Sequence, residues 1–231
     1  MTQEPVAYRD GDLPLGGTLF RPADSPKAAI AVFPTILNPT PAVEAKARAL
    51  ADAGYLALLC DFYGETPADF AASVALSTAL RADARRYRQR LHCALDALTH
   101  EAPGLRRGAI GFCMGGQAVL ELARDGEDLA VVASFHGLLD TRAPAEQGAI
   151  TARILVCHGD ADPLVPREQV MAFWEEMDRA GADWHFHSYA RVVHGFTNPN
   201  RPPAGGPVAF DPSADRQSWA AMLSLFKEVF G

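Results

Sequence analysis

A cysteine between glycines is the residue of this 231-residue chain with the clearest capacity for chemistry. Cys113 lies in Gly111-Phe-Cys-Met-Gly-Gly116, between an apolar run and the helical pattern 117–123. Glycines on both sides let a strand and a helix approach closely at a tight turn. A cysteine at a helix N-terminus, where the helix dipole favours negative charge, is predisposed to be a thiolate. The motif therefore indicates a reactive nucleophile.

An acid and a base follow this cysteine in the order of α/β-hydrolases, which place the nucleophile at a strand-to-helix turn. Asp160 and Asp162 follow the apolar run 153–157, and His194 follows the predicted strand 184–189. All should lie at the carboxyl edge of one sheet, which argues against a mere glycine-bordered turn around a buried cysteine. Position favours Asp162 only modestly, because Asp160 could simply cap the turn whereas Asp162 precedes the stiff Pro163.

Several segments of the chain resemble the dienelactone hydrolase family. The three signature segments are Gly111–Gly116, Gly159–Asp162 and His194–Pro199, and further similarity lies at Phe33-Pro34 and Ala53–Gly64. The resemblance covers nearly the whole chain, from about residue 8 to the last predicted helix. It implies that Cys113, Asp162 and His194 form a catalytic triad.

The implied activity is the hydrolysis of small carboxylic esters or lactones. The thiolate would attack the carbonyl carbon, and water activated by His194 would hydrolyse the thioester acyl-enzyme. The backbone N–H of Met114, directly after the nucleophile, would be one oxyanion-hole donor. By similarity, the backbone N–H of Ile36 is the second. We expect neither a cofactor nor a metal.

Two positions depart from the members of the family that cleave dienelactone. Thr35 stands where those members carry a glutamate that interacts with the resting thiol, so we expect His194 alone to govern the thiol. Asn198 stands where they carry an arginine that holds the substrate carboxylate, and Arg81 lies in a region comparable to that of a second such arginine. The resemblance thus implies the hydrolase chemistry, but not dienelactone as the substrate.

Two other functions stay open. A thioester can be passed to acceptors other than water, which would make the protein an acyltransferase or thioesterase. A non-catalytic homologue could bind a small ligand or sense oxidants through Cys113, because a redox sensor also needs a cysteine of low pKa. The presence of both Asp162 and His194 favours an enzyme, since sensing alone would not require a complete triad.

Other residues are expected near the site because ligands bind beyond the carboxyl ends of the strands of an α/β sheet. Tyr63 and Phe196 are candidates for an apolar pocket lining and His136 for a pocket wall, although each could equally serve in packing. Cys60 and Cys157 end apolar runs and are expected in the core. No C-x-x-C pair or zinc-like His/Cys spacing is present.

The composition is consistent with a single globular domain that buries a substantial core. Hydrophobic residues make up 48% of the chain, and the net charge of −7 gives no electrostatic case for binding nucleic acid or an anionic membrane. No signal peptide or membrane-spanning segment is apparent, and the four cysteines suit a reducing cytoplasm. We expect a cytoplasmic monomer or small homo-oligomer that acts on a small-molecule ester or lactone.

Short apolar runs alternate with helical patterns along the chain. They predict an α/β-hydrolase fold, a mostly parallel sheet with helices on both faces, in one domain over residues 1–231. Residues 65–80 could cover the pocket or form an ordinary helix, and 198–212 should form a loop. Strands are expected at Thr18–Arg21, Ala28–Phe33, Leu56–Asp61, Gly108–Phe112, Ala130–Phe135, Ile154–His158 and Trp184–Tyr189, and helices at Ala42–Ala53, Arg81–Leu98, Gly115–Arg124, Arg167–Ala180 and Ala214–Phe230.

Overall fold

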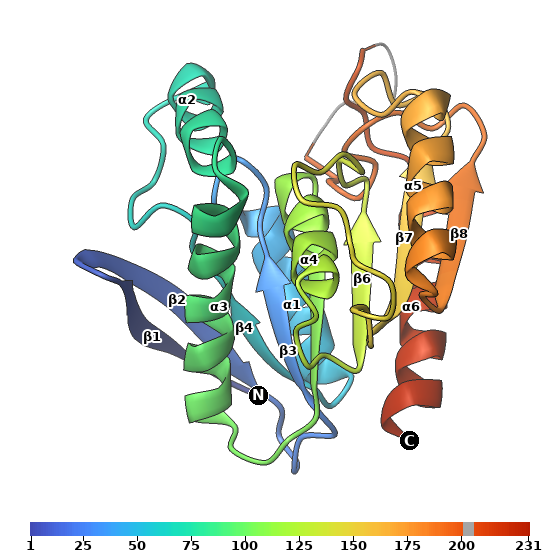
Figure 1. Ribbon diagram of the computed structural model, residues 1–231. Helices are drawn as coiled ribbons and strands as arrows, with labels where there is room; N and C mark the ends of the chain where they lie inside the picture. Colours follow the sequence, from blue (N-terminus) through green and yellow to red (C-terminus); the bar gives the residue numbers. More distant parts are fainter. Residues whose placement is uncertain (201–205) are drawn as a thin grey trace.

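The computed structural model describes residues 1–200 and 206–231, and eight strands in these residues form one sheet (Figure 1). Their order is β1-β2-β4-β3-β5-β6-β7-β8. Strand β2 runs antiparallel to both of its neighbours, and all other pairs are parallel. The strands are β1 (Thr2–Asp10), β2 (Leu13–Arg21), β3 (Ala29–Phe33), β4 (Leu56–Leu59), β5 (Arg107–Phe112), β6 (Val131–Phe135), β7 (Arg153–Gly159) and β8 (Trp184–Tyr189).

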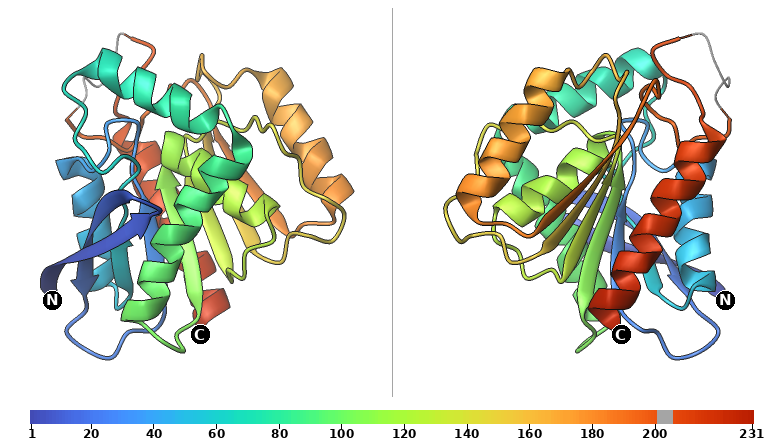
Figure 2. Two further views of the ribbon diagram at one scale, coloured as in Figure 1. Left: turned by 60° about the vertical axis from the view of Figure 1, so that its left-hand side comes forward. Right: turned by 90° about the vertical axis from the view of Figure 1, so that its right-hand side faces the viewer.

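Helices cover both faces of this sheet, which confirms the predicted α/β-hydrolase fold (Figure 2). Helices α3, α4 and α5 pack on one face and α1 and α6 on the other, while α2 lies beyond the carboxyl ends of the parallel strands. None of the helices in the described residues is both long and apolar enough to cross a membrane. The helices are α1 (Pro41–Asp52), α2 (Phe70–Arg81), α3 (Ala84–Glu101), α4 (Met114–Arg124), α5 (Arg167–Ala180) and α6 (Pro212–Phe230).

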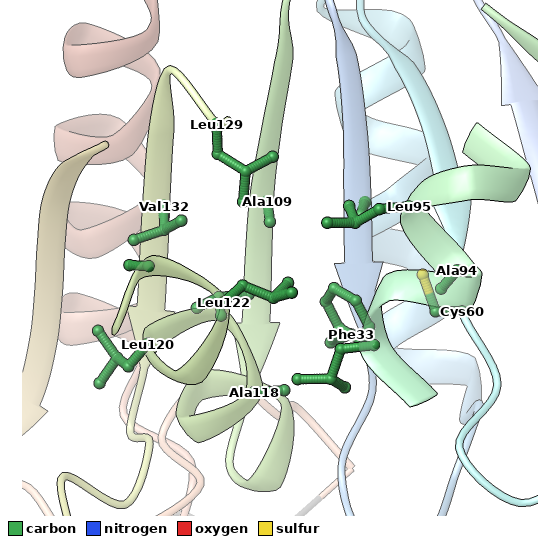
Figure 3. Close-up of a cluster of buried hydrophobic side chains, with 14 of the residues drawn as sticks. Phe33, Cys60, Ala94, Leu95, Ala109, Ala118, Leu120, Leu122, Leu129 and Val132 are labelled. Carbon is green, nitrogen blue, oxygen red and sulfur yellow. The ribbon is translucent and has the colours of Figure 1, made fainter. Parts of the chain in front are cut away.

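The central strands are continuously apolar because both of their faces are buried. In β3, Ala29, Ala31 and Phe33 face the layer of α3 and α4, whereas Ile30 and Val32 face the layer of α1 and α6. Figure 3 shows Phe33 packed near Leu95 of α3 and Ala118 of α4. Removing this apolar surface from water is the main force that holds the helices on the sheet.

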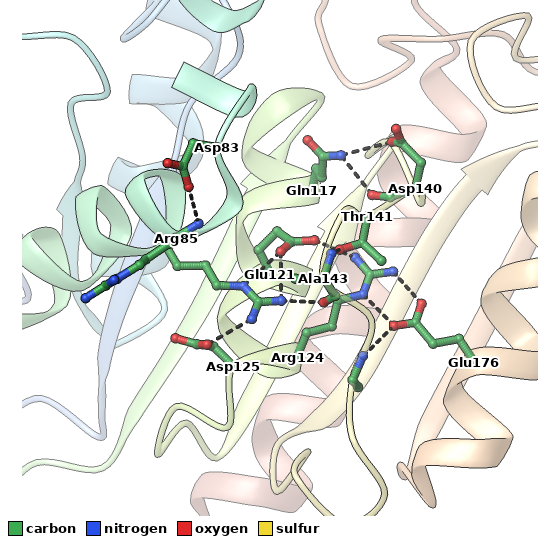
Figure 4. Close-up of polar contacts among 12 residues, drawn as sticks. Asp83, Arg85, Gln117, Glu121, Arg124, Asp125, Asp140, Thr141, Ala143 and Glu176 are labelled. Atoms are coloured by element: carbon green, nitrogen blue, oxygen red, sulfur yellow. Dashed lines mark hydrogen bonds and ion pairs between the residues drawn. The ribbon is translucent and has the colours of Figure 1, made fainter. Parts of the chain in front are cut away.

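A buried ion network joins α4 to α5 (Figure 4). The guanidinium of Arg124, the last residue of α4, donates two hydrogen bonds to the Glu176 carboxylate, of 2.9 and 2.8 Å. It donates others to Glu121, at 3.1 Å, and to the carbonyl oxygen of Leu139, at 2.8 Å. Because each of the three guanidinium nitrogens has a partner, the charge is tolerated in the interior, and the relative position of the two helices is fixed.

The N-terminal hairpin is a difference from the sequence prediction. Strand β1 was not predicted and β2 begins five residues earlier than expected, because β1 is mostly exposed and buries only Val6. Its signal was the dipeptide Gly11-Asp12, since Gly-Asp between two strands favours a two-residue hairpin turn. Gly11 has the positive φ, 58°, that such a turn requires.

The region predicted as one helix at 81–98 contains the end of α2 and most of α3. Arg81 is the last residue of α2, and α3 begins at Ala84. The side chain of Asp83 accepts hydrogen bonds from the N–H groups of Arg85 and Arg86, and such an N-cap starts a new helix. Residues 65–80 therefore contain most of a helix of their own, α2. Within the predicted loop 198–212, residues 201–205 lie outside the described residues and Pro212 begins α6.

The turn between β5 and α4 is too tight for side chains at its glycines. A Cβ on Gly111 would lie 1.9 Å from the carbonyl oxygen of Gly115. A Cβ on Gly115 would lie 2.1 Å from the carbonyl oxygen of Phe33 at the end of β3. These distances are far below van der Waals contact, so the helix must move if either glycine is replaced.

We predict that Gly115→Ala lowers the free energy of unfolding by about 3 kcal/mol, because the added methyl group must displace backbone rather than a flexible side chain. Urea unfolding followed by circular dichroism measures the change. Gly16→Ala is the control, because a Cβ at Gly16 meets nothing within 4 Å. Equal stability of the two variants would contradict the close approach of α4 to β3.

Candidate active site

Cys113 has a strained backbone at the junction of β5 and α4. Its φ and ψ are 57° and −115°, a combination that L-residues rarely adopt. Its N–H donates to the carbonyl oxygen of Phe135 in β6, at 3.0 Å, and α4 begins with the next residue. The residue Cys113 is partly exposed at the carboxyl edge of the sheet. Strain of this kind costs about 1–3 kcal/mol and is concentrated at functional sites.

Asp162 and His194 form a buried hydrogen bond at the same edge. Nδ1 of His194 lies 2.7 Å from Oδ2 of Asp162. The other carboxylate oxygen of Asp162, Oδ1, accepts a hydrogen bond of 2.9 Å from the backbone N–H of Leu164. Asp162 follows β7, and His194 follows β8. Nε2 of His194 makes no hydrogen bond of standard geometry with the described residues. Cys113 nevertheless lies close enough for each group to shift the pKa of the other.

The second candidate acid, Asp160, lies outside this arrangement. Both of its carboxylate oxygens accept hydrogen bonds from the guanidinium of Arg167, at 2.9 and 2.6 Å, on the protein surface. The structure therefore brings Asp162, rather than Asp160, to His194 and Cys113.

The environment of Cys113 favours its charged form. Burial alone would raise the pKa of the thiol, but His194 and the backbone N–H groups of Met114 and Ile36 together lower it. Burial would likewise lower the pKa of His194, but Asp162 and Cys113 raise it well above its ordinary value. The two shifts favour a thiolate–imidazolium pair.

The backbone N–H groups of Met114 and Ile36 both act on the Cys113 thiol, although their residues are far apart in sequence. Met114 is the first residue of α4, and Ile36 lies in the loop after β3. Each donates toward the Cys113 sulfur and contributes to its lowered pKa. Two preorganised backbone donors beside a nucleophile are the arrangement that stabilises a developing oxyanion.

The loop that carries Ile36 is held by Asn38, a residue that sequence reasoning missed. Asn38 is buried and adopts a positive φ of 63°. Its amide donates to Asp61, at 2.6 Å, and to the carbonyl oxygen of Glu65, at 3.0 Å, and it accepts the N–H of Phe62 at 2.9 Å. Its backbone N–H donates to Thr35, at 3.0 Å, which closes the turn around Ile36.

Asp61 extends this network to three other N–H groups. Its carboxylate accepts the N–H of Tyr63 and of Gly64, both at 2.9 Å, and of Gly16 at 3.0 Å. The loops after β3 and β4 are thus joined to β2. Asn38 and Asp61 are 23 residues apart, and only their residue types, which favour turns, were visible in the sequence.

A cavity of about 140 Å³ opens beside Cys113 and His194. Thr35, His136 and Asn198 also line it, so the structure places these three sequence-selected residues at the cavity wall. Most of the other lining side chains in the described part of the chain are apolar. They include Ile36, Leu37, Val43, Phe70, Leu164 and Val208.

His136 lies directly against His194. Their rings pack edge to face with centroids 5.2 Å apart, and Nε2 of His136 lies 2.9 Å from the hydroxyl of Thr197. Burial, together with repulsion from His194, holds the pKa of His136 well below its ordinary value. His136 therefore gives the cavity a neutral wall.

Three other sequence candidates lie elsewhere. Tyr63 is buried behind the turn, with its hydroxyl 3.4 Å from the Met114 sulfur, and Phe196 is fully buried against His136. Arg81 lines a separate small cavity and lies 3.7 Å from Asp140. None of the three is among the described residues that line the cavity at Cys113.

Burial of two other cysteines confirms their predicted place in the core. Cys60 and Cys157 are fully buried, and burial raises the pKa of both thiols. Cys93 is partly exposed on α3, and burial, the largest influence on it, raises the pKa of its thiol. Among the four cysteines, Cys113 therefore stands apart in its lowered pKa.

We predict that iodoacetamide alkylates Cys113 with a pH midpoint below the ordinary thiol value of about 8.5. The reason is that the thiolate, which is the reacting species, is stabilised by His194 and two N–H groups. Rates measured by mass spectrometry of the labelled peptides give the midpoint. Cys93 is an internal control whose midpoint should lie above the ordinary value.

The variant His194→Gln should raise the pH midpoint of Cys113 alkylation by more than about one pH unit. Without the imidazole of His194, the effect of burial, which raises the pKa of the thiol, exceeds the effects that lower it. An unchanged midpoint in this variant would contradict the coupling between the two residues.

Comparison with known proteins agrees with this fold. Residues 15–230 match the model of the dienelactone hydrolase family. Two solved structures, the protein m3DLH and the dienelactone hydrolase-like promiscuous phosphotriesterase P91 from metagenomic libraries, are 34% and 36% identical. Each has a TM-score of 0.92 and covers 100% of this chain and 99% of its own. A probable 2-oxo-3-(5-oxofuran-2-ylidene)propanoate lactonase of Bradyrhizobium sp is 26% identical over 83% of this chain and 79% of its own. The chain belongs to the dienelactone hydrolase family and is a hydrolase-family protein of α/β-hydrolase fold.

Proposed function

We propose that the protein is a cysteine-dependent hydrolase of small carboxylic esters or lactones. The observation that carries the proposal is the buried hydrogen bond of 2.7 Å between Asp162 and His194, beside a thiol of lowered pKa. Asp162 orients the imidazole of His194, and His194 holds the proton that the thiol gives up. Membership of the hydrolase family supports the same reading.

In this proposal the reaction begins when the Cys113 sulfur attacks the ester carbonyl carbon. The carbonyl π electrons move onto oxygen, where the N–H groups of Met114 and Ile36 stabilise the charge. The intermediate collapses, the bond to the alcohol oxygen breaks, and the imidazolium of His194 donates its proton to the leaving alcohol. The products of this half are a thioester on Cys113 and neutral His194.

The second half of the reaction releases the acid. Neutral His194 accepts a proton from water as the water oxygen attacks the thioester carbonyl. The carbon–sulfur bond then breaks, which restores the thiolate and the imidazolium. For a lactone, the alcohol stays attached to the acyl group, and a hydroxy acid leaves in this step.

The relatives guide the choice of test substrates. One is described as a probable lactonase and another as a promiscuous phosphotriesterase. A γ-lactone and a neutral phosphotriester therefore accompany aryl esters in the first assays. Acyl transfer is measured by adding alcohols or amines, since a thioester reacts with either.

We predict that wild-type protein turns over p-nitrophenyl acetate and that Cys113→Ala lowers kcat/KM by at least about 1,000-fold, because the nucleophile is lost. Release of p-nitrophenolate, with both proteins purified in parallel, measures the rates. Cys93→Ala is the matched control and should retain wild-type turnover.

The alternatives give different outcomes. Equal residual rates in wild type and Cys113→Ala would contradict ester hydrolysis and favour ligand binding or oxidant sensing. Product partitioning mainly to an added alcohol would favour an acyltransferase.

We further predict that Asn38→Ala lowers kcat about 10- to 100-fold with little change in KM. The variant loses the contacts that fix the position of the Ile36 N–H group. This N–H stabilises the oxyanion of the transition state but contributes little to binding of the substrate before reaction. Steady-state kinetics with p-nitrophenyl acetate separate the two parameters. A rise in KM alone, with kcat retained, would contradict a role of Asn38 in positioning this donor. Circular dichroism checks that the variant is folded.

A further inference from the structure

We infer that the cavity selects uncharged, apolar acyl groups and excludes substrates that carry a carboxylate, with Phe70 and Leu164 as the residues that form its apolar rim. This inference rests on the proposed function, because it names the substrate class of the same site.

Two large apolar side chains at the cavity are exposed to solvent. Phe70, the first residue of α2, has 64% of its surface exposed, and Leu164, in the loop after β7, has 52%. Both line the cavity that contains Cys113 and His194. Exposed apolar surface next to a reactive group is a recognised mark of a ligand site.

The cavity has no free cation among the described residues that line it. Lys46 is their only lysine or arginine. Its ammonium lies 2.5 Å from Oδ1 of Asp215 and 5.0 Å from the centroid of the Trp219 ring. Lys46 is therefore already neutralised by a carboxylate and is not available for a second anion.

The reacting groups repel a carboxylate as well. The thiolate of Cys113 and the imidazolium of His194 neutralise each other, and the carboxylate of Asp162 adds a negative charge behind them. His136, the remaining titratable wall residue, is neutral because its pKa is depressed. An anionic acyl group would lose its hydration here and gain no ionic partner among the described residues that line the cavity.

The volume of the cavity limits the acyl group. About 140 Å³ is room for several water molecules. A short acyl chain therefore fits within it, and a longer apolar chain would reach Phe70 and Leu164 at the rim.

The test compares two alkyl esters of equal acyl length, ethyl butyrate and ethyl hemisuccinate, which differ in a terminal methyl or carboxylate group; pH-stat titration of the released acid measures the rates. Alkyl esters are used because the free carboxylate of an aryl hemisuccinate would expel the phenolate without the enzyme. We expect kcat/KM to favour butyrate by about 30-fold or more, because burial of an unpaired carboxylate is strongly unfavourable. Equal values, or a preference for the hemisuccinate, would overturn the inference.

Substitutions at the rim test the two named residues. Phe70→Arg and Leu164→Arg should each reduce the butyrate-to-hemisuccinate ratio by about fivefold, because they introduce a cation at the mouth. Met171→Arg is the matched control: Met171 is also an exposed apolar residue, with 56% of its surface exposed, but it does not line the cavity. The inference is wrong if Met171→Arg changes the ratio as much as the rim variants do.

A binding measurement separates failure of this inference from failure of the proposed function. Butyranilide and N-phenylsuccinamic acid are a matched neutral and anionic pair of amides, and their effect on Cys113 alkylation by iodoacetamide needs no turnover. Butyranilide should slow alkylation, and the acid at equal concentration should not. Equal protection by both overturns the inference even if ester hydrolysis is observed, and selective protection upholds it even if hydrolysis is not.

Discussion

The contact between the Gly115 backbone and the end of β3 is the constraint on which the site depends. No Cβ fits between Gly115 and the carbonyl oxygens of Phe33 and Pro34. This approach places the first N–H of α4 beside the loop that follows β3. Met114 and Ile36 can therefore donate toward one sulfur, although they come from different elements. A helix further from the sheet would leave the two donors too far apart to share an oxyanion.

The charge distribution depends on the same assembly. Burial opposes a thiolate at Cys113, and only the combined effect of His194 and two N–H groups reverses that opposition. These groups come from the loops after β3 and β8 and from the start of α4. No local segment could stabilise the thiolate by itself. The strained φ of Cys113 is tolerated for the same reason, since the packing of β5 and α4 over-determines it.

Sequence reasoning succeeded where function depends on order along the chain. A nucleophile, an acid and a base that each follow a strand must meet at one sheet edge, so the meeting of Cys113, His194 and one of two aspartates could be predicted. The family resemblance, rather than chain order, selected Asp162 over Asp160. Pocket lining depends instead on loop conformation. Tyr63 follows a strand as the acid does, but its side chain turns into the core behind Met114. Phe70 was overlooked because only the start of α2 reaches the cavity.

Reactivity and selectivity at this site have one physical cause. Apolar walls exclude water, and the lower local polarity strengthens the attraction between the thiolate and the imidazolium. The same walls deprive any further charge of hydration, so that a second anion finds neither solvent nor, among the described lining residues, a free cation. Lys46 could offer such a cation, but Asp215 already holds it. A cavity that stabilises its own ion pair in this way is therefore poorly suited to a charged substrate, and the uncharged ester bond is the polar group that it can best accept.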